Sequence, residues 1–229
     1  MPFRKSRNVI RSLPVSFPYL YKTDRIHRAL VQAIGMNNIK TMKQEWEQRL
    51  SDHQKKNKWM TPRDMRRLVL LGLRLGLDRA PKQRILDLGC GTGYFLYVCR
   101  HFGHDVMGID LPRNGLFDAW VSFLKIPRVL FRIQPYTPLP PSDGPFDLIT
   151  AILPTFHKGW TEPEWKFFLN DIHSRLSPNG KAYVMSNIAK SSQMLSNVEF
   201  KNFFTSLPTF EAQMLTPREV LLHRKQIAS

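Results

Sequence analysis

The stretch RILDLGCGTG, residues 84–93, decides the fold class of this chain. Its first part, Arg84–Leu88, is short and mostly aliphatic, which is typical of a buried strand in a parallel sheet. Glycines at positions 89, 91 and 93 then let the backbone turn tightly and approach a ligand. A helix is predicted from Tyr94, and its N-terminus would face an anionic group at the turn. The stretch therefore predicts a strand, a ligand-binding turn and a helix.

Apolar and amphipathic segments alternate downstream of this turn. Further strands are predicted at 106–109, 129–133, 146–152 and 182–185. Helices are predicted at 94–102, 114–124, 161–176 and 191–206. Two last segments, 210–215 and 220–224, flank Thr216-Pro217-Arg218-Glu219 and predict a closing hairpin. The pattern predicts an α/β fold with a doubly wound, mostly parallel sheet that gains one antiparallel strand from the hairpin.

The first 80 residues follow a different pattern. Helices are predicted at 24–36, at 38–58 and from Pro62 onward, with Thr23 as the N-cap of the first. Pro81 ends the third helix. We therefore expect a helical N-terminal extension over residues 1–80, acting as a lid or acceptor platform, and a ligand-binding domain over residues 81–229.

Positive charge is concentrated in this extension. The 229 residues include 34 Lys and Arg against 18 Asp and Glu, a net charge of +16. Residues 1–84 hold 20 of these cations and 6 of the acids, a net +14, which leaves +2 for the rest. Such asymmetry indicates RNA, an anionic membrane surface or an acidic partner, the alternative being a solvated surface that maintains solubility. Arg63, Arg67 and Arg74 recur at helical spacing, either as a phosphate-binding stripe or as an ordinary solvated face.

Several classes of protein are disfavoured by composition. No apolar run approaches the roughly 20 residues of a membrane-spanning helix. The two cysteines, Cys90 and Cys99, are too few for a disulfide framework or a four-thiolate zinc site. No His, Asp and Cys residues have convincing ligand spacing, so no metal is expected. We expect a cytoplasmic protein, leaving peripheral membrane association and organellar import open.

An acidic residue after the second strand narrows the ligand class. Asp110 follows Asp87 at the predicted carboxyl end of the next strand, where a carboxylate can accept hydrogen bonds from two ribose hydroxyls. Two classes of adenosine cofactor remain. The dinucleotide pattern G-x-G-x-x-G requires a glycine where Tyr94 stands. Asp87 favours a cofactor with an ammonium group, which S-adenosylmethionine carries.

Four segments in order, ILDLGCGTGYF, VMGID, FDLITAI and LSPNGKAYV, resemble the class I S-adenosylmethionine-dependent methyltransferases. The resemblance covers about residues 81–229 and implies a seven-stranded sheet with one antiparallel strand, and S-adenosyl-L-methionine as cofactor. The cofactor-binding residues that it implies are Asp87, Gly89, Cys90, Gly91, Gly93, Asp110, Leu111 and Gln134. Those from Asp87 to Gly93 would surround the methionine part. Asp110 would hold the ribose and Leu111 would pack beside the adenine. Gln134 stands where many members carry an acid that bonds the adenine amine.

The residues after the fourth strand, ILPTFHKGW at 152–160, bear on the methyl acceptor. Enzymes that methylate base amines often carry Asn, Asp or Ser followed by Pro-Pro-aromatic here, whereas Leu153 cannot accept a hydrogen bond from an amine. Methylation of pyrimidine carbon 5 needs a nucleophilic cysteine, and neither Cys90 nor Cys99 is suitably placed. The paired glutamates of arginine methylation are absent from this segment.

His157 is the best candidate for a general base, because imidazole can take a hydroxyl proton at neutral pH. The alternative is a loop histidine bonded to the backbone. Candidate acceptor-site residues are Tyr94, Phe156 and Trp160. We expect methyl transfer to a small-molecule, glycan or lipid-linked acceptor, at oxygen. The alternatives are an RNA methyltransferase that grips RNA with its extension, and a non-catalytic member of the fold.

Overall fold

The computed structural model describes residues 17–47, 62–111, 115–157, 159–186 and 197–225 of the chain. The chain divides into two compact units. The N-terminal unit is Met1–Asp78 and the C-terminal unit is Arg79–Ser229. No helix in the described ranges is long and apolar enough to cross a membrane.

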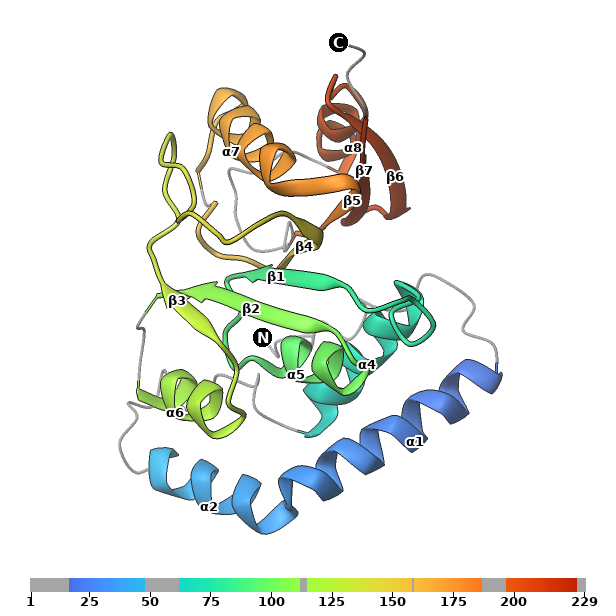
Figure 1. The fold of residues 1–229 in the computed structure, drawn as a ribbon, viewed down its shortest axis with the longest axis vertical. Helices are drawn as coiled ribbons and strands as arrows, with labels where there is room; N and C mark the ends of the chain where they lie inside the picture. Colours follow the sequence, from blue (N-terminus) through green and yellow to red (C-terminus); the bar gives the residue numbers. More distant parts are fainter. Residues whose placement is uncertain (1–16, 48–61, 112–114, 158, 187–196, 226–229) are drawn as a thin grey trace, which may run out of the picture. The chain divides into compact units, whose positions relative to one another are not determined.

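The described part of the N-terminal unit is helical (Figure 1). Its helices are α1 (Phe17–Ile34), α2 (Met36–Glu47) and α4 (Pro62–Arg74). The buried side of α1 carries Ile26, Leu30 and Ile34, which recur at helical spacing. Two ion pairs tie the unit together: Arg66 Nε lies 2.5 Å from Asp24 Oδ1, which joins α4 to α1, and Lys22 bonds to Asp78.

The predicted start of the first helix was wrong. Helix α1 begins at Phe17, with Pro18 in its first turn, where the missing N–H of proline leaves no hydrogen bond unmade. Thr23 is therefore not an N-cap: it is buried within the helix, and its hydroxyl donates to the Tyr19 carbonyl over 2.7 Å. The described part of the second helix ends at Glu47, and the rest of its predicted range, 48–58, lies outside the described residues.

The C-terminal unit contains a seven-stranded sheet in the order β3-β2-β1-β4-β5-β7-β6. Its strands are β1 (Arg84–Leu88), β2 (Asp105–Asp110), β3 (Arg128–Leu130), β4 (Phe146–Ile152), β5 (Leu176–Met185), β6 (Phe210–Thr216) and β7 (Glu219–Arg224). β7 is antiparallel to both of its neighbours, β5 and β6, whereas the other pairs are parallel. The predicted doubly wound, mostly parallel sheet with one antiparallel strand is confirmed.

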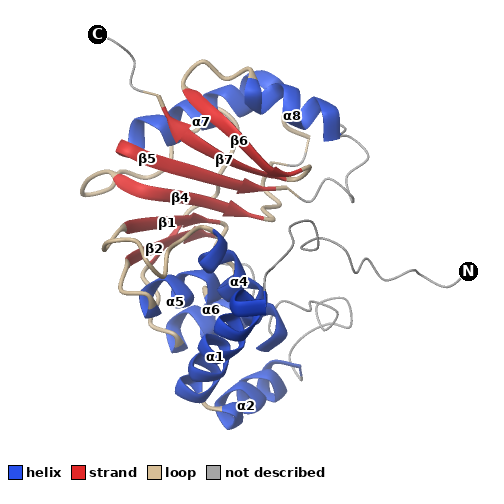
Figure 2. Cartoon of the chain, turned by 90° about the vertical axis from the view of Figure 1, so that its right-hand side faces the viewer, coloured by secondary structure: helices blue, strands red, loops and turns tan. Residues whose placement is uncertain are grey.

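Helices accompany this sheet in the described part of the unit (Figure 2). They are α5 (Tyr94–His101), α6 (Gly115–Phe123), α7 (Glu162–Arg175) and α8 (Asn197–Thr205). The predicted capping box of α7 is present: the backbone N–H of Glu164 donates to the Thr161 side chain, and the backbone N–H of Thr161 donates to the Glu164 carboxylate over 2.5 Å. Of the predicted range of the last helix, 191–196 lies outside the described residues.

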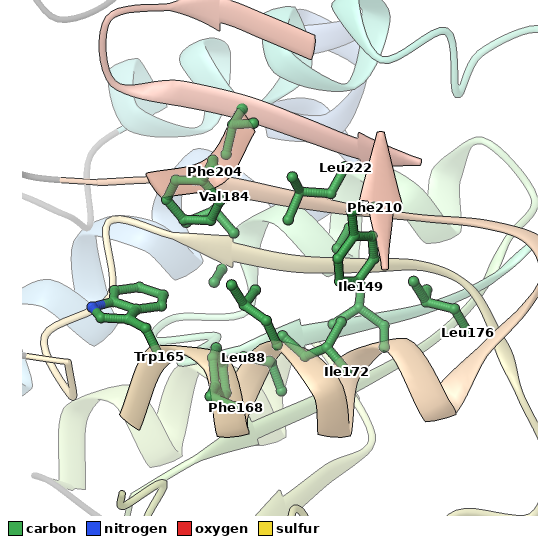
Figure 3. Close-up of a cluster of buried hydrophobic side chains, with 14 of the residues drawn as sticks. Leu88, Ile149, Trp165, Phe168, Ile172, Leu176, Val184, Phe204, Phe210 and Leu222 are labelled. Carbon is green, nitrogen blue, oxygen red and sulfur yellow. The ribbon is translucent and has the colours of Figure 1, made fainter. Parts of the chain in front are cut away.

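Helices α7 and α8 share one hydrophobic core with the sheet (Figure 3). Trp165, Phe168 and Ile172 of α7 meet side chains from the sheet and from α8. The labelled members of this core from the strands and α8 are Leu88, Ile149, Leu176, Val184, Phe204, Phe210 and Leu222. Because each strand contributes alternate residues to this face, the intervening residues lie on the opposite face of the sheet.

One strand is longer than predicted. β5 was expected over 182–185 after a turn at 178–180, but it starts at Leu176. The predicted turn coincides with an irregularity in the register, because Phe146 pairs with Leu176 whereas Leu148 pairs with Lys181. The extra residues of β5 are accommodated there without ending the strand.

Candidate active site at the carboxyl ends of the strands

The glycine turn after β1 has the backbone that only glycine adopts readily. Gly89, Gly91 and Gly93 have φ angles of 79°, 54° and 74°, all in the left-handed region. Backbone bonds hold the turn: Gly89 N–H donates to the carbonyl of Ile109 in β2 over 2.7 Å, and Gly93 N–H donates to the Cys90 carbonyl over 2.9 Å. A Cβ added at Gly91 would meet no atom within 4 Å, so a ligand can approach the backbone there.

Asp110, the last residue of β2, lies against this turn. The backbone N–H of Gly91 donates to its Oδ2 over 2.6 Å, and that of Leu111 donates to its Oδ1 over 2.7 Å. A carboxylate has about four acceptor positions on its two oxygens, so each oxygen can still accept another donor. The structure therefore fixes the carboxylate in one orientation at the turn and leaves it able to accept two hydroxyls.

Asp87, in β1 just before the turn, is deeply buried, with 3% of its surface exposed. Its Oδ1 accepts a 2.7 Å hydrogen bond from the Thr150 hydroxyl. Burial raises the pKa of Asp87 from 3.8 to about 7; the Thr150 bond lowers it, and the nearby Asp110 charge raises it. A cationic ligand group beside this carboxyl would favour its ionised form.

Cys90 contributes its backbone to the turn but directs its side chain into the protein. A Cβ added at Gly108 of β2 would lie only 2.5 Å from Cys90 Sγ, so the sulfur packs directly on the glycine. Burial raises the pKa of this thiol strongly, which makes it a poor nucleophile. Of the predicted adenine neighbours, Leu111 is half-buried directly after Asp110, and Gln134 is exposed in the loop after β3.

Aromatic side chains gather after the end of β4. The half-buried Phe156 ring lies 3.8 Å from where a Cβ on Gly89 would stand, so it reaches the glycine turn. The ring centroid of Trp160 lies 5.5 Å from that of Phe156. His157 is 2% exposed, and its ring centroid lies 5.1 Å from Trp165 and 5.9 Å from Phe156. The structure thus brings together three of the predicted residues, Phe156, His157 and Trp160.

Tyr94 has a different setting. Its side chain is buried, and its ring packs edge-to-face on Trp120 of α6 with the centroids 5.5 Å apart. The Tyr94 ring is therefore part of the hydrophobic core of the C-terminal unit. Contact between Tyr94 and an acceptor stays a prediction.

Three further residues in or just after β4 and β5 were not predicted as part of the site. Thr150 holds Asp87; a signal for it was a polar residue in the middle of the apolar strand FDLITAI. Ser186, directly after β5, is buried, and its hydroxyl has no hydrogen-bond partner among the described residues. Leu153 has a φ of 50°, rare for leucine, and its N–H donates to the Met185 carbonyl over 2.8 Å. No local sequence signal marks either of the last two.

Comparison with known proteins identifies the domain. Residues 85–180 match a family model described as a methyltransferase domain. Phosphoethanolamine N-methyltransferase 3 of Arabidopsis thaliana is 26% identical over 167 residues, which cover 63% of this chain and 34% of that protein. The match therefore spans about a third of the length of this curated relative.

Two solved structures show the same fold. PH0226 from Pyrococcus horikoshii OT3 matches with a TM-score of 0.52 and 13% identity, over 71% of this chain and 92% of that one. CalS10, an amino pentose methyltransferase from Micromonospora echinaspora described as bound to S-adenosylmethionine, matches with a TM-score of 0.50 and 16% identity, over 69% and 90% of the two chains. The family match covers the glycine turn, and the strand order agrees with these structures; the C-terminal unit has the fold of the class I S-adenosylmethionine-dependent methyltransferases.

Proposed function

We propose that this enzyme transfers a methyl group from S-adenosylmethionine to a hydroxyl oxygen of a small-molecule, glycan or lipid-linked acceptor. The observation that carries the proposal is the position of His157. It lies beside Phe156, whose ring reaches Gly89 of the glycine turn. A hydroxyl must lose its proton when its oxygen is methylated, and imidazole is well suited to accept that proton.

The residues around the turn fit the cofactor. The two oxygens of Asp110, each already fixed by one backbone N–H, retain the capacity to accept the two ribose hydroxyls. Asp87 supplies a buried carboxylate for the ammonium group of the methionine part. The open space at Gly91 allows the ligand to contact the backbone. Leu111 and Gln134 are proposed to contact the adenine.

When bound, S-adenosylmethionine supplies an electrophilic methyl group whose bond to sulfur breaks as the oxygen–carbon bond forms. His157 accepts the proton of the acceptor hydroxyl, which balances the charge lost at the sulfonium. Phe156 and Trp160 exclude water and orient the acceptor. The buried Ser186 hydroxyl, at the neighbouring strand end, provides a further hydrogen-bonding group for a polar acceptor.

RNA is the second candidate acceptor. The observation that favours it is a group of exposed cations in the N-terminal unit that includes Lys40, Arg63 and Arg67. Cations of this kind neutralise phosphates and would give RNA binding that weakens steeply with salt.

Transfer of labelled methyl groups tests these proposals. Cell extract is separated into small-molecule, glycan, lipid, RNA and protein fractions, and each is incubated with the enzyme and S-adenosylmethionine labelled in its methyl group. Label in one of the first three fractions, with mass spectrometry showing an O-methyl product, supports the leading proposal. Label in RNA supports the second candidate. Cofactor binding without label in any fraction would favour the non-catalytic alternative, and an N-methyl product would remove the role given to His157.

A further inference from the structure

The outward side of α1 is a distinct surface of the N-terminal unit. Tyr21, Arg25, Arg28 and Gln32 are all exposed there. They follow one another at steps of four, three and four residues, so they form one stripe along the helix. The opposite stripe of α1 is the buried one that carries Ile26, Leu30 and Ile34. The apolar side of the helix is thus used in packing, and its polar side remains available.

Charge on this stripe is mainly positive. The only acid in α1 is Asp24, and its carboxylate already binds Arg66, which lowers the Asp24 pKa. Arg28 donates from Nε to the backbone carbonyl of Asp24 over 3.3 Å, and its guanidinium takes part in no ion pair between described residues. Arg25 takes part in no ion pair between residues that the structure describes. The two outward guanidinium groups therefore retain most of their positive field.

Apolar side chains accompany these cations. Leu20 and Tyr21 near the start of α1 are 37% and 61% exposed, and Met36 at the start of α2 is 46% exposed. Helix α1 spans roughly 27 Å at 1.5 Å per residue, and in the sequence these residues precede and follow the two arginines. Exposed Leu and Met side chains gain little by contacting the phosphate backbone of RNA, whereas they can be buried in the headgroup region of a bilayer.

We propose that the α1 face, defined as Tyr21, Arg25, Arg28 and Gln32, binds the surface of a bilayer rich in anionic phospholipid, together with Leu20 beside it and Met36 just after the helix. The arginines pair with lipid phosphates, and the apolar side chains enter the headgroup region. An RNA strand is disfavoured because sequence-independent binding of single strands uses several stacking aromatics, and this face offers Tyr21 alone. The inference goes beyond the proposed function, since docking needs neither cofactor nor acceptor.

Vesicle binding tests the inference with the full-length protein. Co-sedimentation is measured with vesicles of phosphatidylcholine containing about one-third phosphatidylglycerol, and with vesicles of phosphatidylcholine alone, at low and high salt. Binding to the anionic vesicles is expected, with affinity falling as salt rises. The double variant Arg25→Glu/Arg28→Glu is expected to bind them at least about tenfold more weakly. Leu20→Ser/Tyr21→Ser is expected to lower the part of the binding that survives high salt.

A matched control separates local from overall charge. Lys166 and Lys201 are exposed on α7 and α8, and Lys166→Glu/Lys201→Glu changes the net charge by the same amount. Its affinity is expected to stay within about twofold of the native protein. Equal losses in both double variants, or no binding of the native protein to anionic vesicles, would overturn the inference. So would binding to single-stranded RNA that depends on Arg25 and Arg28 while vesicle binding does not. Circular dichroism and cofactor affinity check that each variant is folded, so failed docking and failed methyl transfer are seen separately.

Discussion

The hydroxyl of Thr150 in β4 donates to Oδ1 of Asp87 in β1 over 2.7 Å, and the two residues are direct neighbours in the parallel register. This bond is the described interaction that opposes the rise in the Asp87 pKa caused by burial. If Asp87 holds the cationic group of the cofactor as proposed, the affinity for the cofactor is expected to depend on Thr150, a residue that need not touch the cofactor.

Replacing Thr150 with Val should move the pH dependence of cofactor binding. Loss of the hydroxyl raises the pKa of Asp87 further above about 7, so less of the carboxyl is ionised at neutral pH. Affinity for S-adenosylmethionine should fall by several-fold at pH 7 and recover at higher pH. Calorimetry between pH 6 and 9 measures this shift, with Thr150→Ser as the control that keeps the hydroxyl. Identical pH profiles for the Val variant and the native enzyme would contradict the role of the bond.

Asp87→Asn should weaken cofactor binding and stabilise the ligand-free protein. The folded-state pKa of Asp87, about 7, lies above its ordinary value of 3.8, so between these pH values the unfolded state holds fewer protons. The free energy of unfolding therefore falls as pH rises through this window, by at most about 4 kcal/mol. The asparagine side chain cannot ionise, so the variant does not lose this stability as the pH rises. Urea denaturation without cofactor should show a gain from the substitution that is larger at pH 7 than at pH 4.5; an equal gain at both would rule out this origin.

Asp110→Ala should weaken S-adenosylmethionine binding by about 100-fold or more, because hydrogen bonds to a charged group are worth roughly 1.5–3 kcal/mol each and two are lost. The control is Asp105→Ala, which removes an exposed carboxylate that pairs with Lys82 at the other end of the same strand. Its affinity should not change. Native affinity in the Asp110 variant would remove the ribose role of this carboxylate.

His157→Ala should lower the turnover number roughly 100-fold or more while leaving cofactor affinity near that of the native enzyme. Because His157 is buried among aromatic rings, His157→Gln serves as a second variant that fills more of the space. His101→Ala, at an exposed position on α5, is the control. Turnover is measured with the acceptor found by labelling. A folded variant with an unchanged rate would exclude general-base catalysis by this imidazole.

Gly108→Ala should destabilise the C-terminal unit by about 2 kcal/mol or more, because the new methyl group would lie 2.5 Å from Cys90 Sγ. Adding Cys90→Ala removes the sulfur and should restore part of the lost stability. Urea denaturation of the two single variants and the double variant measures this coupling. Strict additivity would show that the sulfur is not the cause of the clash.

Local chemistry explains what could be predicted from the sequence. The bounds of β1 and β4 were predicted as observed, because an aliphatic run flanked by turn-forming residues leaves little choice. The place of Asp110 beside the glycine turn followed from the same local pattern. The predictions that were wrong concern residues whose positions depend on tertiary packing. Thr23 precedes Asp24 and resembles a helix cap, yet burial places it inside α1.

The residues after β4, where the acceptor is proposed to bind, also depend on tertiary packing that the sequence pattern does not predict. That Phe156 would approach Gly89 depends on how the segment after β4 folds back toward the segment after β1, which periodicity does not encode. The bond from Thr150 to Asp87 likewise requires the register of two strands far apart in the sequence. The burial of Ser186 could not be predicted either, because it depends on the pairing of β5 with β7. The N–H of Ser186 donates to the carbonyl of Arg218, just before β7.

The insertion of β7 between β5 and β6 has a consequence for synthesis of the enzyme. β6 has β7 as its sheet neighbour, so it cannot join the sheet until residues 219–224 have emerged from the ribosome. Until then the edge of β5 that β7 will cover stays open to pairing with other chains. A nascent chain stalled before Glu219 should therefore depend on chaperones far more than one stalled after Arg224.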